Sequence, residues 1–203
     1  MNINFKDITV YSLNPEIYKS REYYIQELRN LGIFKAVERV AFDYKLKDRL
    51  WTIIMAHLFA LIKARDAYAF PVLLLEDDAR LMKEFPESMN VPDECNLVYL
   101  GGSLYNCGQT PTMHIENYNK DFYRVYYMLC AHAILIMNEK GCKTIVDAYT
   151  DAIFKGLFND VSLSMRSKEN IFLTPKDGMY FYQEGAVENI TRFLWKDKLN
   201  LLR

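Results

Sequence analysis

Three consecutive acidic residues, Glu76, Asp77 and Asp78, are the strongest chemical signal in the sequence. They follow Pro71 and an apolar run over residues 72–75, a pattern typical of a strand covered on both faces. Crowded carboxylates repel each other unless a positive group lies among them. Hard divalent cations such as Mn²⁺ and Mg²⁺ prefer carboxylate and phosphate oxygens, so we predict a site for a metal and a diphosphate here. A solvated turn or a helix N-terminus is the alternative interpretation of the same triplet.

The elements that must position these acids alternate between strands and helices. Apolar runs of strand length occupy residues 8–13, 37–42, 72–75, 97–100 and 133–137. Helical spacing of apolar residues covers about 23–31, 50–67 and 138–149. Such alternation is typical of an α/β sheet with helices on its faces. In open sheets of this class, ligands bind beyond the carboxyl ends of the strands, which is where the acidic triplet is expected.

Length, charge and cysteine spacing exclude several classes of protein. The 203 residues suffice for one domain, and 25 basic against 26 acidic side chains leave a formal charge of −1. This balance gives no global attraction to nucleic acid or to anionic lipid. No transmembrane segment and no signal peptide are evident, so we expect a cytoplasmic protein. The four cysteines show no CxxC spacing of a zinc ribbon or a redox pair.

The order of these signals resembles that of the family 25 glycosyltransferases, which include lipooligosaccharide galactosyltransferases and the collagen galactosyltransferase domain. The matching segments are residues 56–58, 72–79, 97–102, 132–136, 140–143 and 159–163, then Gln183 ahead of 188–190. The resemblance implies a single domain over 1–203 with a Rossmann-like GT-A fold, that is, a mixed, mostly parallel sheet flanked by helices. Its donor half would span about 1–102 and its acceptor half about 103–203.

The resemblance also implies an activity. A hexose or deoxyhexose would be transferred, with inversion, from a nucleoside-diphosphate donor to a glycan, glycolipid or glycoprotein acceptor, and a UDP-sugar is the favoured donor. The cofactor would be Mn²⁺ or Mg²⁺, held by Asp78 and Asp77. Glu76 occupies the first position of the family's DxD-like motif, which leaves open whether Glu76 or Asp77 contacts the ribose or the metal.

Two other functions remain open. A binding module that kept the fold and lost turnover would still bind a nucleotide sugar. A nucleotidyltransferase also uses acids at strand ends together with metal ions. That class usually carries a Gly-rich loop that cradles phosphate, and the sequence contains none.

Further side chains are candidates for the donor site. Leu13 and Asn14 stand where the family's nucleotide loop is expected, and Arg21 would be a partner on the following helix. Asp43, after the second predicted strand, is a candidate for a contact with the base or the ribose. Its alternative is a solvated loop acid.

The predicted donor site is completed by His57, Gly101 and Gly102, whereas His132 is expected outside it. The resemblance moves His57 toward the donor, although a core histidine bonded to backbone is the alternative. Gly101 and Gly102 allow close approach of a ligand and would form a sugar-binding floor, with a plain turn as the alternative. His132 is expected just before a strand, and we predict a structural role for it rather than metal ligation.

Inverting transfer needs a general base near the acceptor hydroxyl. Asp160 is the first candidate because it precedes apolar residues in a predicted short helix. The cap of that helix, provided by Asn159 or Asp160, is the alternative role. Glu184 is the reserve candidate, and a loop salt bridge is its alternative.

Overall fold

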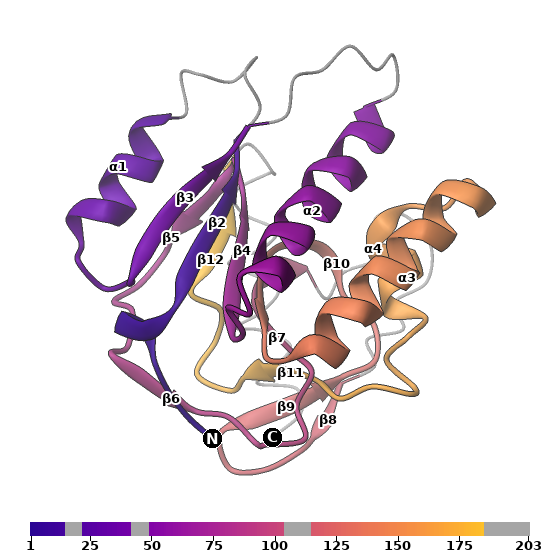
Figure 1. Cartoon of the computed structure of the whole chain (residues 1–203). Helices are drawn as coiled ribbons and strands as arrows, with labels where there is room; N and C mark the ends of the chain where they lie inside the picture. Colours follow the sequence, from indigo (N-terminus) through magenta and orange to yellow (C-terminus); the bar gives the residue numbers. More distant parts are fainter. Residues whose placement is uncertain (15–21, 42–48, 104–114, 185–203) are drawn as a thin grey trace.

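The computed structural model describes residues 1–14, 22–41, 49–103 and 115–184, in which a central sheet carries helices on both faces (Figure 1). Eight strands hydrogen-bond in the order β3-β2-β4-β10-β7-β11-β9-β8. In that order they are Ala36–Val40, Thr9–Leu13, Val72–Glu76, Leu129–Ile136, Leu97–Ser103, Phe172–Pro175, Phe122–Val125 and Ile115–Asn117. The helices are α1 (Glu22–Asn30), α2 (Arg49–Asp66), α3 (Glu139–Lys155) and α4 (Asn159–Ser164), with a 3-10 turn at Phe5–Asp7. Two small sheets pair β1 (Asn2–Asn4) with β6 (Ser88–Asn90), and β5 (Ala79–Leu81) with β12 (Phe181–Gln183).

The central sheet is mixed. β2 is parallel to both β3 and β4, and β7 is parallel to β11. β10 lies antiparallel between β4 and β7, so those two strands point the same way. The carboxyl ends of β2, β3 and β4 lie at the upper edge of the sheet in Figure 1. The predicted fold class, a mixed α/β sheet flanked by helices, is confirmed, but β10 does not repeat the direction of β4.

The two faces of the sheet pack against different helices because apolar side chains alternate along each strand. In β4, Val72 and Leu74 belong to the core shared with α2 and α3. Leu73 and Leu75 belong to the core that α1 covers through Ile25. Burial of β4 on both faces explains its continuous apolar sequence.

Helix α2 has the predicted bounds to within a residue or so, but only one of its sides is buried. Trp51, Phe59 and Ile62 are 43%, 52% and 46% exposed, so apolar side chains at helical spacing also lie on the outer side of this helix. Helix α3 begins after Asn138, whose side chain accepts a hydrogen bond from the Gly141 N–H. In the described part of the chain, none of the helices combines the length and the hydropathy that crossing a bilayer requires.

Candidate functional site

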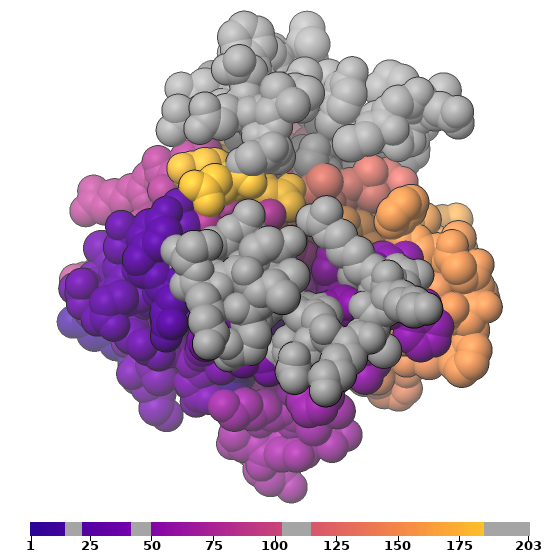
Figure 2. Space-filling model, turned by 90° about the horizontal axis from the view of Figure 1, so that it is seen from above, coloured from indigo at the N-terminus to yellow at the C-terminus, as the bar shows by residue number. Residues whose placement is uncertain are grey.

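Polar residues follow the neighbouring parallel strands β2 and β4 at the upper edge of the sheet. The two strands pair in register, with Leu13 opposite Glu76, so the loops that begin at Asn14 and Asp77 start side by side. Asn14 is buried, and its N–H donates to the carbonyl of Val40 at 3.2 Å. Viewed from this end, the segments of α1 and of α3 and α4 lie on opposite sides of the molecule (Figure 2). The predicted donor residues Leu13, Asn14 and Glu76 therefore share one edge of the fold.

Asp78 has one bonded and one unbonded carboxylate oxygen. Its Oδ2 accepts from Nε2 of Gln183 at 3.1 Å, and its backbone carbonyl accepts from the Glu184 N–H at 2.8 Å. The pairing of β5 with β12, which sets Gln183 opposite Ala79, brings these residues together. Oδ1 of Asp78 is buried and has no hydrogen-bond partner among the described residues. Buried polar atoms are seldom left in that state, so this oxygen is suited to a cation.

The carboxylates at this position suit a metal ion that is held partly by the protein and partly by a substrate. Within the described ranges, no three His, Cys, Asp or Glu side chains are arranged to hold an ion by themselves. Mg²⁺ and similar hard ions are usually held by one or two carboxylates together with phosphate oxygens. Asp78, with the adjacent Asp77, provides carboxylates of that kind.

His57 and Glu76 form a polar pair between α2 and β4. Nδ1 of His57 lies 2.8 Å from the Ile53 carbonyl, and Nε2 lies 3.6 Å from Oε1 of Glu76. Burial lowers the pKa of His57 to about 4, although the bond to Ile53 acts in the opposite direction. Because a carbonyl only accepts, the neutral ring carries its proton on Nδ1. Nε2 then presents a lone pair toward the carboxylate, and the two acceptors together can receive a hydroxyl donor.

Gly101 and Gly102 lie inside β7, so the strand continues past the predicted end at residue 100, and the plain turn that was their alternative role does not occur. A Cβ at Gly101 would lie 2.5 Å from Nε2 of His132, and one at Gly102 would lie 2.7 Å from Sδ of Met128. The glycines are therefore required by close packing of β7 against the segment that enters β10. His132 lies within β10 rather than before a strand.

Asp160 lies in the first turn of α4 and faces the start of β10. Its Oδ2 accepts from the Cys130 N–H at 2.8 Å. Cys130 has φ of +48°, a left-handed conformation that costs energy for a residue with a Cβ. Burial raises the pKa of Asp160 to about 6, while the N–H groups of Cys130 and Ala131 lower it. A carboxylate with a pKa near neutrality is suited to proton transfer.

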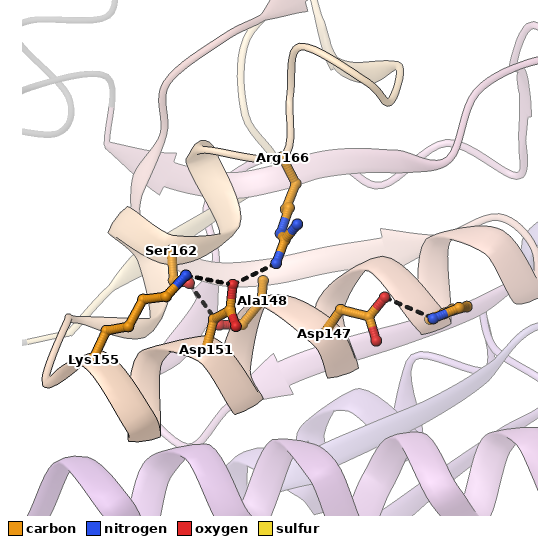
Figure 3. Close-up of polar contacts among 7 residues, drawn as sticks. Asp147, Ala148, Asp151, Lys155, Ser162 and Arg166 are labelled. Atoms are coloured by element: carbon orange, nitrogen blue, oxygen red, sulfur yellow. Dashed lines mark hydrogen bonds and ion pairs between the residues drawn. The ribbon is translucent and has the colours of Figure 1, made fainter.

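Helix α4 is fastened to α3 by polar contacts (Figure 3). The Ser162 hydroxyl donates to the Ala148 carbonyl at 2.6 Å. Asp151 receives Nη2 of Arg166 at 2.5 Å and Nζ of Lys155 at 3.0 Å. The bond from Ser162, and the ion pair of Arg166, which follows α4, hold α4 and Asp160 against α3, whereas the pair of Lys155 with Asp151 lies within α3. Asp160 does not cap α4, because its N-cap residue is Phe158, which makes no side-chain capping bond.

Glu184 is held by two neighbours. Its Oε2 pairs with Nη2 of Arg80 at 2.5 Å, and its Oε1 accepts from the Tyr24 hydroxyl at 2.6 Å. Burial, followed by the bond to Glu184, raises the pKa of Tyr24. Arg80 also donates to the carbonyl of Asp77 at 2.9 Å. Glu184 therefore makes the salt bridge that was its alternative role. Through Arg80, this bridge is connected to the backbone of Asp77.

Some residues of the predicted site cannot be placed, and others were missed. Arg21 and Asp43 lie outside the described residues. Arg80 and Cys130 were not predicted to contribute, and Gln183 was recognised only as part of a matching segment. An arginine two residues after an acidic cluster is a signal that could have identified Arg80, because neighbouring carboxylates favour a cation among them. The left-handed backbone of Cys130 has no comparable signal in the sequence.

Comparisons with known proteins support the fold. No protein-family model matches the chain, and no curated protein matches it in sequence. Among solved structures, the chain is similar to a glycosyltransferase involved in the glycosylation of the major capsid of PBCV-1. The TM-score is 0.50 at 7% identity, over 95% of this chain and 98% of that one. The chain therefore shares the fold of that structure.

Two further structures show weaker likeness. A197 from STIV aligns with a TM-score of 0.47 at 9% identity, over 86% of this chain and 83% of that one. Apo UDP-glucose pyrophosphorylase aligns with a TM-score of 0.46 at 11% identity, over 94% of this chain and 82% of that one.

Proposed function

We propose that this protein is a metal-dependent glycosyltransferase that uses a nucleoside-diphosphate sugar, with UDP as the favoured nucleotide. The observation that carries the proposal is the buried, unbonded Oδ1 of Asp78 at the carboxyl end of β4. Asp78, with Asp77, would hold Mn²⁺ or Mg²⁺ together with the donor diphosphate. When bound, such an ion neutralises the charge that develops on the departing diphosphate. Membership of glycosyltransferase family 25 belongs to the same proposal.

The donor nucleotide would lie across the ends of β2 and β4. Leu13 and Asn14 would contact its base and ribose, and the paired acceptors Nε2 of His57 and Oε1 of Glu76 would receive a ribose or sugar hydroxyl. Gly101 and Gly102 would form the floor beneath the transferred sugar. The donor half over 1–102 and the acceptor half over 103–203 keep their predicted limits in this proposal.

Asp160 would be the general base. Its carboxylate takes the proton from the acceptor hydroxyl as that oxygen forms a bond to the anomeric carbon. The bond from this carbon to the diphosphate oxygen breaks at the same time, on the opposite face, so the configuration inverts. With a pKa of about 6, most of Asp160 is ionised at pH 7 and remains basic enough to accept the proton.

Glu184, the reserve candidate for the base, receives a positioning role in this proposal. Both of its carboxylate oxygens are engaged by Arg80 and Tyr24, and its N–H donates to Asp78. It would therefore hold the acidic loop rather than accept a proton. The acceptor is proposed as a glycan, glycolipid or glycoprotein.

A thermal-shift and calorimetry series tests the proposal. The protein is titrated with UDP, GDP and CDP and with their sugars, each with and without Mn²⁺, because a ligand that binds only the folded state raises the melting temperature. We expect a shift that requires both Mn²⁺ and one nucleotide, and its loss in Asp78→Asn. Asp121→Asn, which changes an exposed carboxylate away from the site, is the control.

The same series separates the alternatives. Release of UDP from a UDP-sugar in the presence of acceptors, lost in Asp160→Asn, supports a transferase. Binding without release of UDP or transfer indicates a non-catalytic module. Formation of a nucleotide sugar from a nucleoside triphosphate and a sugar phosphate indicates a nucleotidyltransferase. The absence of any metal-dependent shift would overturn the proposal.

A further inference from the structure

His132 lies between two backbone carbonyls that belong to different parts of the candidate site. Its ring is 1% exposed, with Nδ1 2.7 Å from the Cys130 carbonyl and Nε2 3.2 Å from the Phe181 carbonyl. Burial lowers the pKa of His132, and the neutral ring carries a single N–H, which donates to the Cys130 or to the Phe181 carbonyl according to the tautomer. The buried ring therefore joins the two segments that carry those carbonyls through one hydrogen bond and one packing contact.

The contact with Cys130 connects His132 to Asp160, the proposed base. Cys130 has the left-handed φ of +48°, and its N–H donates to Oδ2 of Asp160 at 2.8 Å. The pairing of β10 with β7 is irregular between Leu129 and Ala133, so the ladder alone does not fix this peptide. The contact of Nδ1 with the Cys130 carbonyl holds the other end of the same residue.

The contact with Phe181 connects His132 to Asp78, the proposed metal ligand. Phe181 opens β12, and two residues later Gln183 donates to Oδ2 of Asp78 at 3.1 Å. The next N–H, that of Glu184, donates to the Asp78 carbonyl at 2.8 Å. The position of β12 therefore sets the position of Asp78.

Gly101 in the neighbouring strand β7 leaves room for the His132 ring. A Cβ at Gly101 would lie 2.5 Å from Nε2 and 2.7 Å from Cδ2 of His132, closer than atoms in contact can approach. Any other residue at this position would push the ring away from one or both carbonyls. Gly101 and His132 thus form one packing unit beneath the site.

We propose that His132 is a positioning residue that couples the carboxylate of Asp160 to the carboxylate of Asp78 through Cys130 and β12. The functional names of those two carboxylates rest on the proposed function, but the coupling itself does not. His132 acts through its neighbours and touches no reacting atom. A change at His132 therefore alters the two halves of the site separately, according to which contact is lost.

Two amide variants separate the contacts. The Asn side chain places its nitrogen near the position of Nδ1, so His132→Asn retains the contact with Cys130 and loses the one with Phe181. The Gln side chain reaches the position of Nε2, so His132→Gln has the opposite effect. Thr174→Val, which removes a buried hydroxyl bonded to the Tyr99 carbonyl at 3.1 Å, is the matched control.

The primary measurement is amide hydrogen exchange of the full chain, resolved at the Cys130 and Glu184 N–H groups. We expect exchange at Glu184 to be about tenfold faster in His132→Asn with Cys130 unchanged, and the reverse in His132→Gln. Thr174→Val should change neither site selectively. If both His132 variants change the two amides equally, or change neither, His132 is only a core residue and the coupling is refuted.

A second measurement connects the coupling to activity. In His132→Asn the concentration of Mn²⁺ needed for half-maximal UDP binding should rise while kcat is spared, and in His132→Gln kcat should fall while the metal requirement is unchanged. Opposite or identical effects in the two variants would overturn the coupling. If wild-type protein binds no UDP with Mn²⁺, the proposed function fails, but the exchange result still decides the coupling.

Discussion

Replacement of Asp160 by Asn should stabilise the protein at neutral pH and remove transfer. Burial raises the pKa of Asp160 from its ordinary value of 3.8 to about 6, despite the N–H groups of Cys130 and Ala131. Each pKa unit corresponds to about 1.4 kcal/mol, so ionisation costs the fold about 3 kcal/mol. The side chain is partly exposed, and solvent screening reduces this to about 2 kcal/mol. The Asn carbonyl can still accept the Cys130 N–H, so the variant should lose the charge without losing that bond.

The pH dependence of stability follows from the sign of this shift. The folded protein holds the Asp160 proton more tightly than the unfolded chain, so the raised pKa stabilises the fold at low pH. This stabilisation is complete below about pH 4 and is lost as the pH rises through about 6. The Asn variant does not titrate there. Its advantage in free energy of unfolding should therefore grow by about 2 kcal/mol between pH 4 and pH 7.

Urea unfolding of both proteins at half-unit steps from pH 4 to pH 7.5 measures this difference. Asp147→Asn, which alters an exposed α3 carboxylate paired with Lys143, is the control and should show no such growth. In transfer assays at pH 7, Asp160→Asn should lower kcat by about a hundredfold or more without weakening UDP binding. An Asn variant that is less stable than wild type at pH 7, with an unchanged pH dependence, would refute the raised pKa and the choice of Asp160 as the base.

Three further predictions concern the metal side, the packing beneath the site and the helix that carries the base. Asp78→Ala should abolish metal-dependent UDP binding in calorimetry and leave the metal-free protein folded, because it removes the unbonded Oδ1 and one hydrogen bond, from Gln183 to Oδ2, worth about 1 kcal/mol. An unfolded variant would contradict this. Gly101→Ala should lower the free energy of unfolding by about 2 kcal/mol, measured by urea denaturation, because the new methyl group meets the His132 ring; wild-type stability would show that the ring can move. Ser162→Ala should cost about 1 kcal/mol in the same assay and reduce kcat more than donor affinity, since it loosens α4 from α3.

The part of the site that follows β4 could be predicted because local sequence determines it. An apolar run of strand length that ends in three acids has few ways to be buried, and the strand lies centrally between β2 and β10. The start of α3 was predicted within a residue because Asn138 caps it. Its end was placed too early, near Tyr149, although Gly156 with φ of +63° stops the helix. A glycine at that position is the signal that marks the end.

Other features depend on contacts between distant segments. The pairing of Arg80 with Glu184 joins residues 104 positions apart, and no local pattern specifies it. The direction of β10 was also missed, because an apolar run has the same appearance whichever way the strand runs. Its antiparallel insertion is set by its two neighbours, β4 and β7. Glu184 was considered as a base because the sequence does not reveal its pairing with Arg80.

The reversed direction of β10 explains how Asp160 reaches the site. β10 enters the sheet at the upper edge, and its 8 residues span about 26 Å toward the opposite edge. The 17 residues of α3 then span about 26 Å at 1.5 Å per residue, which returns the chain to the level at which β10 began. Gly156 ends α3 there, and α4 begins three residues later. The Cys130 N–H and the Asp160 carboxylate meet because strand and helix have matched lengths, so the position of the proposed base is fixed by the geometry of two regular elements rather than by a long loop.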